Sequence, residues 1–241
     1  MSTQPDRRDA DAWARPVDRL TGDGGHINVT GRRPTAPMNG FGRMWQKTYR
    51  ISLGPRPQPA DVIAEWKQHF PEFWPSGNRF FAPLAGIAPG EVAALDLAMP
   101  GGLKLSTGVL VLFADTESFT LMTPEGHMFA GWITFSSFVA EGETCAQAQV
   151  LMRASDPLYE VGMTMGGHRK EDAHWAHTLR ALAAHFGVDA AVDVQTVCVD
   201  RKRQWSRAGN VWHNAGIRSS LHMAGTPMRA LGRMRHRDAG A

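Results

Sequence analysis

The apolar positions near the end of the chain recur with the period of an α-helix. In RKEDAHWAHTLRALAAHFG (169–187), large apolar residues fall at i, i+4, i+7, i+8 and i+11, namely Trp175, Leu179, Leu182, Ala183 and Phe186. Such a stripe predicts a helix that buries one face, and Gly187 follows in the position of a C-terminal cap. Docking its four large side chains contributes roughly 6–12 kcal/mol, at about 1.5–3 kcal/mol each. We therefore expect this helix to be docked.

Between residues 91 and 155 the pattern changes to the two-residue alternation of β-strands. The short separators PGG, ADTE, PEG and AEGE divide five apolar segments, at 91–99, 103–114, 118–123, 127–138 and 144–154. Connections this short join hairpin partners, whereas parallel strands need much longer crossovers. We therefore expect an antiparallel meander of about five strands, which is the surface that receives the helix.

Alternation also predicts which side chains face the interior of this sheet. In the second segment the apolar face comprises Leu103, Leu105, Val109, Val111 and Phe113; in the last it comprises Ala146, Ala148, Val150, Met152 and Ala154. The strand 128–138 is apolar on both faces, with Trp132 opposed by Phe129, Ile133 and Phe135, which favours a strand that is covered on both sides.

Further segments flank the meander. Residues 44–53 alternate as a strand, and Pro59 begins a helix with apolar residues three and four apart. The first 40 residues are polar and lack an apolar period, which favours disorder. The predicted organisation is a disordered lead-in at 1–40, one domain at 41–190, and a C-terminal strand with a basic amphipathic helical extension at 191–241.

A strand, a short helical insertion, an antiparallel meander and a long C-terminal helix follow one another in the helix-grip order. TPEGHMFAGWITFS (123–136) and HWAHTLRALAAHFG (174–187) resemble the hairpin and the closing helix of the START-like (SRPBCC) superfamily, which includes polyketide cyclases and lipid-transfer domains. The resemblance covers roughly residues 44–187. It implies an α+β fold in which a curved antiparallel sheet wraps the long helix, with a cavity between them for a hydrophobic small molecule or lipid.

Composition and charge refine this interpretation. The 241 residues are 43% hydrophobic and 20% charged. No run approaches the roughly 20 apolar residues of a membrane span, and the N-terminus lacks a secretory apolar stretch. The two cysteines do not make a disulfide framework. We expect a cytoplasmic protein.

The formal net charge of +3 is unevenly distributed. Residues 200–241 contain nine Lys and Arg against two acidic residues, interleaved with apolar side chains. This extension could contact an anionic membrane surface or a protein partner, or it could pack on its own domain. Nucleic acid is the least favoured partner, because the excess of arginine over lysine is typical of GC-rich coding sequence.

The implied cavity would be lined by large apolar side chains. The candidates are Phe113, Phe119, Leu121, Trp132, Met152, Trp175 and Leu179. For each of them, ordinary core packing is the alternative interpretation.

Groups able to perform acid–base chemistry are scarce on the predicted inner face. Glu125 and His127 are the candidate catalytic residues, and an exposed turn is their alternative interpretation. His174, His177 and His185 share one side of the closing helix, about 120° from the apolar stripe. A metal would need a third ligand from elsewhere, so we expect neither a metal nor a cofactor.

These observations leave three functions open. The first is a module that sequesters, carries or senses a hydrophobic small molecule. The second is an enzyme, such as a polyketide cyclase or dehydratase, that uses the same cavity. The third is an interaction protein that acts through its basic tail. Scarcity of inward acid–base groups favours the first over the second.

Overall fold

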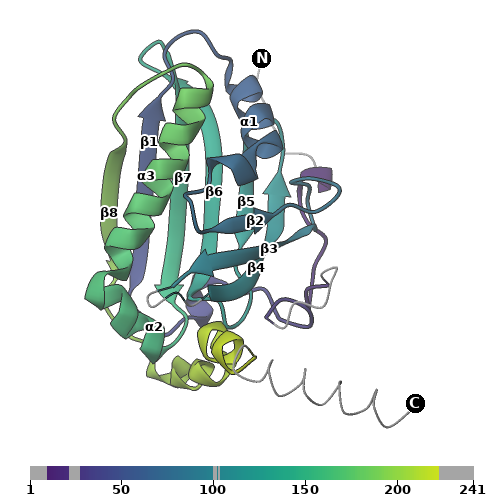
Figure 1. The fold of residues 1–241 in the computed structure, drawn as a ribbon, viewed down its shortest axis with the longest axis vertical. Coiled ribbons are helices and arrows are strands. Elements are labelled where there is room, and N and C mark those ends of the chain that lie inside the picture. Colours follow the sequence, from purple (N-terminus) through teal and green to yellow (C-terminus); the bar gives the residue numbers. More distant parts are fainter. Residues whose placement is uncertain (1–9, 22–27, 100–101, 103, 223–241) are drawn as a thin grey trace, which may run out of the picture.

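The computed structural model describes residues 10–21, 28–99, 102 and 104–222, which form one curved antiparallel sheet and a long helix packed across it (Figure 1). The strands are β1 (Met44–Ser52), β2 (Arg79–Phe81), β3 (Val92–Ala98), β4 (Lys104–Ala114), β5 (Ser118–Met122), β6 (Phe129–Ala140), β7 (Glu143–Ala154) and β8 (Asp193–Asp200). The helices are α1 (Pro59–Gln68), α2 (Pro157–Gly162) and α3 (His168–His185). The predicted α+β, helix-grip architecture is confirmed.

The strand order across the sheet is β2-β3-β4-β5-β6-β7-β1-β8, and every neighbouring pair is antiparallel. Strands β3 to β7 are the predicted meander. β1 pairs with the last strand of the meander, and β8 adds an edge strand beyond β1. The sheet bends so that its β2–β4 end curls around toward the side that carries α3 (Figure 1).

The closing helix docks on the concave face through the predicted stripe. Leu179, Leu182 and Ala183 are buried, while Trp175 and Phe186 are partly buried against the same core. Helix α1 buries Val62, Ile63 and Trp66 on that core, and the missing amide hydrogen of Pro59 suits the first helical position. A 3₁₀ turn at Phe70–Phe73 then leads toward β2.

A β-bulge in β4 changes the face of one predicted inward residue. Val111 pairs with Leu121 and Phe113 pairs with Thr120, so that Leu112 is an extra residue. An extra residue shifts the alternation by one. Phe113 therefore lies on the outer face, where its ring centroid is 4.7 Å from that of Trp13.

The segment expected to be a disordered lead-in instead packs on this outer face, over residues 10–21 and 28–40. Leu20 and Val29 are buried in a second apolar cluster with Leu110 of β4. The amide of Ala14 donates to the carbonyl of Leu112. We call residues 10–21 and 28–40 the N-terminal cover. The sequence pattern did not predict it, because its few apolar residues follow no period and each contacts the sheet separately.

The C-terminal extension also packs on the domain as far as the structure describes it. A 3₁₀ helix at Trp205–His213 is followed by helical residues 215–222. Asn28 donates to the carbonyl of Ala215 and to Ser219 Oγ, which joins the two flanking segments. Residues 223–241, the last part of the predicted basic tail, lie outside the described residues.

Candidate ligand-binding cavity

A cavity of about 780 Å³ lies between α3 and the concave face of the sheet. Apolar side chains from the five strands β3 to β7 make most of its wall, including Leu95, Val109, Leu121, Ile133, Val150 and Met152. A volume of this size falls in the range of about 300–1,000 Å³ that is typical of small-molecule sites. The sheet and α3 therefore enclose a void instead of closing tightly on each other.

Four of the seven predicted lining residues border this cavity. Leu121, Met152 and Trp175 contribute to its wall and pack with the main core. Trp132 also borders it, next to Gly131 and Ile133. It lies on the other face of β6 from Ile133, opposite Met122 of β5.

The other three predicted residues lie elsewhere in the fold. Phe119 is fully buried, and its ring is 4.7 Å from Phe135 and 5.4 Å from Phe70, centroid to centroid. Leu179 is fully buried under α3. Phe113 lies on the outer face because of the bulge. These three side chains pack the core or the cover and do not line the cavity.

A kink between α2 and α3 forms one side of the cavity mouth. Met165 and Gly166 leave helical geometry, and Gly166 has a φ of 119° that glycine adopts without strain. Residues from Gly162 to Gly167 border the cavity, and the Met165 side chain there is 82% exposed. This segment therefore contributes backbone, the buried Met163 side chain and the exposed Met165 side chain to the cavity wall.

One wall of the cavity carries buried polar atoms that have no hydrogen-bond partner among the described residues. They are Nε1 of Trp74, Nε2 of His174 and Oε1 of Glu171. The ring centroids of Trp74 and His174 are 4.8 Å apart. A buried polar group without a partner is costly, and the three residues that carry these atoms all border the cavity.

Burial changes the protonation of this wall. It raises the pKa of Glu171 to about 7, with Asp172 adding to the rise and Lys47 opposing it. Burial lowers the pKa of His174 to about 4, helped by nearby His177. At neutral pH the wall therefore carries a neutral imidazole and a carboxyl group that gains a proton more readily than an exposed glutamate does.

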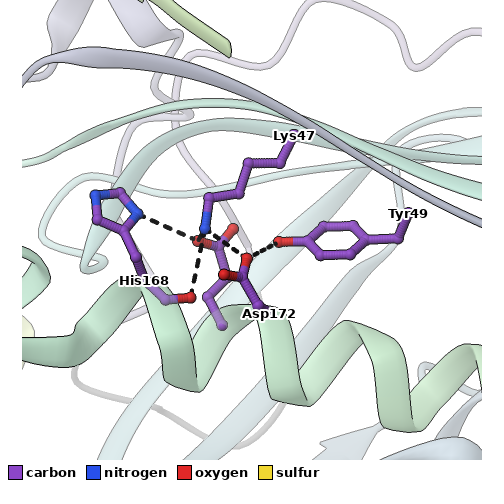
Figure 2. A network of polar contacts seen from close by, with 5 residues as sticks. Lys47, Tyr49, His168 and Asp172 are labelled. Atoms are coloured by element: carbon purple, nitrogen blue, oxygen red, sulfur yellow. Dashed lines mark hydrogen bonds and ion pairs between the residues drawn. The ribbon is translucent and has the colours of Figure 1, made fainter. Parts of the chain in front are cut away.

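Glu171 is paired with Lys47, which belongs to a polar network between β1 and α3 that also includes Tyr49, His168 and Asp172 (Figure 2). Lys47 Nζ lies 2.9 Å from Glu171 Oε2 and 2.7 Å from Asp172 Oδ1. Tyr49 donates its hydroxyl to Asp172 at 2.7 Å, and the carbonyl of His168 accepts from Lys47 at 3.4 Å. Burial, with the neighbouring Glu171 and Asp172 charges, raises the pKa of Tyr49, so its phenol stays protonated as the donor.

His127 and Glu125, the predicted catalytic pair, are separated by the structure. His127 borders the cavity and is only 5% exposed, so it does not lie on an exposed turn. Its Nδ1 accepts from the amide of Phe129 at 3.0 Å, and burial lowers its pKa to about 4. Glu125 is instead paired with Arg32 and His213, so it helps to hold the two flanking segments.

The sequence reasoning missed Trp74, Glu171 and Lys47, and it placed His174 on an exposed side of its helix. One available signal was the apolar stripe itself. Glu171 stands four residues before Trp175, so it continues the same helical face as a polar residue. Lys47 gave no comparable signal, because its partners lie more than 120 residues away.

Comparison with protein-family models gives no match, and comparison with curated sequences gives none either. The search of solved structures gives matches at low identity. The di-domain ARO/CYC StfQ from the steffimycin biosynthetic pathway is 12% identical, with a TM-score of 0.47 over 63% of this chain and 54% of StfQ. A START superfamily protein from Mycobacterium smegmatis is 18% identical, with a TM-score of 0.40 over 61% of this chain and 98% of that protein.

A third match is Ara h 8.0201, which is 11% identical with a TM-score of 0.42 over 61% of this chain and 99% of its own. The chain thus spans about half the length of StfQ but nearly all of the other two. TM-scores below 0.5 leave the function to be argued from the cavity itself.

Among the described residues, no helix is long and apolar enough to cross a membrane. The sheet wrapped on α3 gives the chain a helix-grip fold.

Proposed function

We propose that this protein binds a small, mainly apolar molecule in the cavity between α3 and the sheet. The observation that carries the proposal is a void of about 780 Å³ with a wall of aliphatic and aromatic side chains. A void of this size left unfilled forfeits contacts that well-packed interiors make. An apolar ligand would make these packing contacts. Transfer of its apolar surface from water into the cavity would also be favourable.

The polar wall adds a second feature to the expected ligand. Trp74 Nε1 can only donate a hydrogen bond, whereas a neutral His174 can accept or donate at Nε2 according to its tautomer. Small side-chain rotations would turn these buried atoms toward the cavity, where a ligand with a carbonyl or hydroxyl group at one end would satisfy them. We therefore expect an amphipathic ligand in preference to a pure hydrocarbon.

Binding of the neutral fluorescent probe N-phenyl-1-naphthylamine tests the cavity. Val109→Trp places a large ring inside the void and should weaken probe binding by about tenfold or more, which is about 1.4 kcal/mol. Phe119→Leu is the matched control, because it removes buried aromatic volume from a residue that does not line the cavity. It should lower stability and leave the probe affinity nearly unchanged.

Two outcomes would count against the proposal. The wild-type protein could fail to bind the probe, or both variants could weaken binding equally. Native mass spectrometry of the protein purified from its own cells is a separate test: a retained apolar mass is the expected result and would identify the class of ligand.

A second candidate function is proton transfer to or from a molecule in the same cavity. It is favoured by Glu171, whose pKa of about 7 suits a group that both accepts and donates a proton near neutrality. Glu171→Gln keeps the shape of the side chain and removes this proton exchange. A bound ligand whose mass changes with time in the wild type should change about 10²- to 10⁴-fold more slowly in the variant. A retained ligand that stays unchanged in the wild type would leave binding as the function.

A further inference from the structure

A group of metal-ligating side chains lies outside the cavity, where the end of α1 meets the end of α3. Glu65 and His69 are one helical turn apart at the end of α1, and His185 is the last residue of α3. One potential ligand atom from each of these residues lies within 4.8 Å of the other two. We propose that Glu65, His69 and His185 form a binding site for a divalent transition metal, with Zn²⁺ as the expected ion.

The distances between these atoms suit a tetrahedral ion. Glu65 Oε2 lies 2.9 Å from His185 Nε2 and 3.6 Å from His69 Nε2. Ligands about 2.0–2.1 Å from a tetrahedral zinc ion stand about 3.3 Å from one another. The two observed distances fall on either side of this value, so small side-chain rotations would bring all three atoms onto one ion.

Surrounding contacts orient the two imidazole rings. His69 Nδ1 lies 3.0 Å from Glu72 Oε1, and donation of its hydrogen to that carboxylate leaves the Nε2 lone pair for a metal. Carboxylates commonly orient metal-binding histidines in this way. The His185 ring packs against Phe73 and Phe186, with centroid distances of 5.6 and 5.5 Å. Both rings are thus positioned by groups that are not themselves ligands.

The donor set selects the class of ion and leaves one position open. Two imidazoles and one carboxylate favour zinc and its neighbours over calcium or magnesium, which prefer oxygen ligands. The side chains of His69, Glu65 and His185 are 27%, 39% and 33% exposed, so an ion could enter from solvent. A fourth position would be filled by water. The bound ion would fasten α1 to α3.

Titration of the untagged, chelator-treated protein with ZnCl₂ tests the site, in competition with a chromophoric chelator. The wild type should bind one zinc ion per chain at this site, and its Tm should rise with zinc. His185→Ala and Glu65→Gln should each lower the affinity by more than about tenfold, and Glu72→Gln, which removes only the orienting carboxylate, by about tenfold. His177→Ala is the matched control, because this exposed histidine of α3 is not in the group.

Glu65→Gln keeps nearly the same shape, so it remains informative if a histidine variant fails to fold. The proposal is overturned if the wild type binds no zinc at micromolar concentrations. It is equally overturned if Glu65→Gln and His177→Ala bind zinc as the wild type does, since the ion would then be held elsewhere.

Discussion

The Lys47 ammonium lies 2.9 Å from Glu171 Oε2, and both side chains are almost completely buried between β1 and α3. Removing one partner of a buried ion pair is strongly destabilising, because the other charge is then left buried without an opposite charge. Because Glu171 also faces the cavity, this ion pair connects the stability of the fold with the charge of the candidate site.

Lys47→Met should therefore destabilise the protein at pH 8 by about 3–5 kcal/mol, because Glu171 loses its opposite charge. The double variant Lys47→Met/Glu171→Gln should recover much of this loss, since no buried charge is left without a partner. Urea unfolding of the three proteins measures the effect. Equal losses in the single and double variants would show that the pair has little role.

His127 predicts a loss of stability in acid. Its pKa is about 4 in the folded protein and about 6.5 in the unfolded chain. The unfolded state therefore binds the proton more tightly, so the contribution is intact above pH 6.5 and is lost as the pH falls toward 4. The loss reaches about 3 kcal/mol at 1.36 kcal/mol per pH unit.

The opposite shift of Glu171 runs through an overlapping range, so wild-type data alone do not isolate His127. The contribution of His127 is isolated by subtracting the unfolding free energy of the wild type from that of His127→Gln. This difference should rise by up to about 3 kcal/mol as the pH falls from 7 to 4, because only the wild type loses the contribution of the neutral imidazole. A difference that stays constant with pH would contradict a neutral buried imidazole.

Leu20→Ala tests whether the N-terminal segment is part of the folded domain. Leu20 is 1% exposed in the cluster with Val29 and Leu110. Truncating a buried leucine to alanine costs about 2–5 kcal/mol, whereas the same change in a disordered lead-in would cost almost nothing. Thermal and urea unfolding measure it. Val17→Ala, a partly buried neighbour in the same segment, should cost less.

Tyr159→Phe tests the docking of the C-terminal extension. The Tyr159 hydroxyl accepts a hydrogen bond from the amide of Gly216 at 2.9 Å. Its loss should cost about 1–3 kcal/mol, because the amide is left without its partner. Limited proteolysis should then cut 205–222 faster than in the wild type. Unchanged cleavage would mean that other contacts, such as those of Asn28, suffice.

The regular part of the fold could be predicted because its signals are periodic. The stripe from Trp175 to Phe186 and the alternation across 91–155 each repeat over many residues, so they specify both the element and its buried face. The bulge at Leu112 could not be predicted in this way, since one extra residue leaves no mark on composition. The bulge places Phe113 on the outer face, although Phe113 stands two residues after Val111, as an inward-facing strand residue would.

The candidate site was predicted less completely than the fold. Apolar lining residues follow from alternation, and Leu121, Met152 and Trp175 do border the cavity. Phe119 was indistinguishable from them, because a strand pattern gives the face of a residue but not the place where the helix leaves space. The polar wall depends on contacts between distant segments, such as those of Trp74 with His174 and of Lys47 with Glu171, and the residues around each of them appear ordinary in sequence.

Strand β4 contributes side chains to two layers of the protein, one on each face of the sheet. Val109 and Val111 contribute to the interior beside α3, whereas Leu110 and Phe113 contribute to the layer beneath the N-terminal cover. Substitutions in one layer therefore leave the shape of the other nearly untouched. Evolution could replace the N-terminal cover on the outer face and preserve the cavity on the concave face. It could equally reshape the cavity for a new ligand and retain the cover.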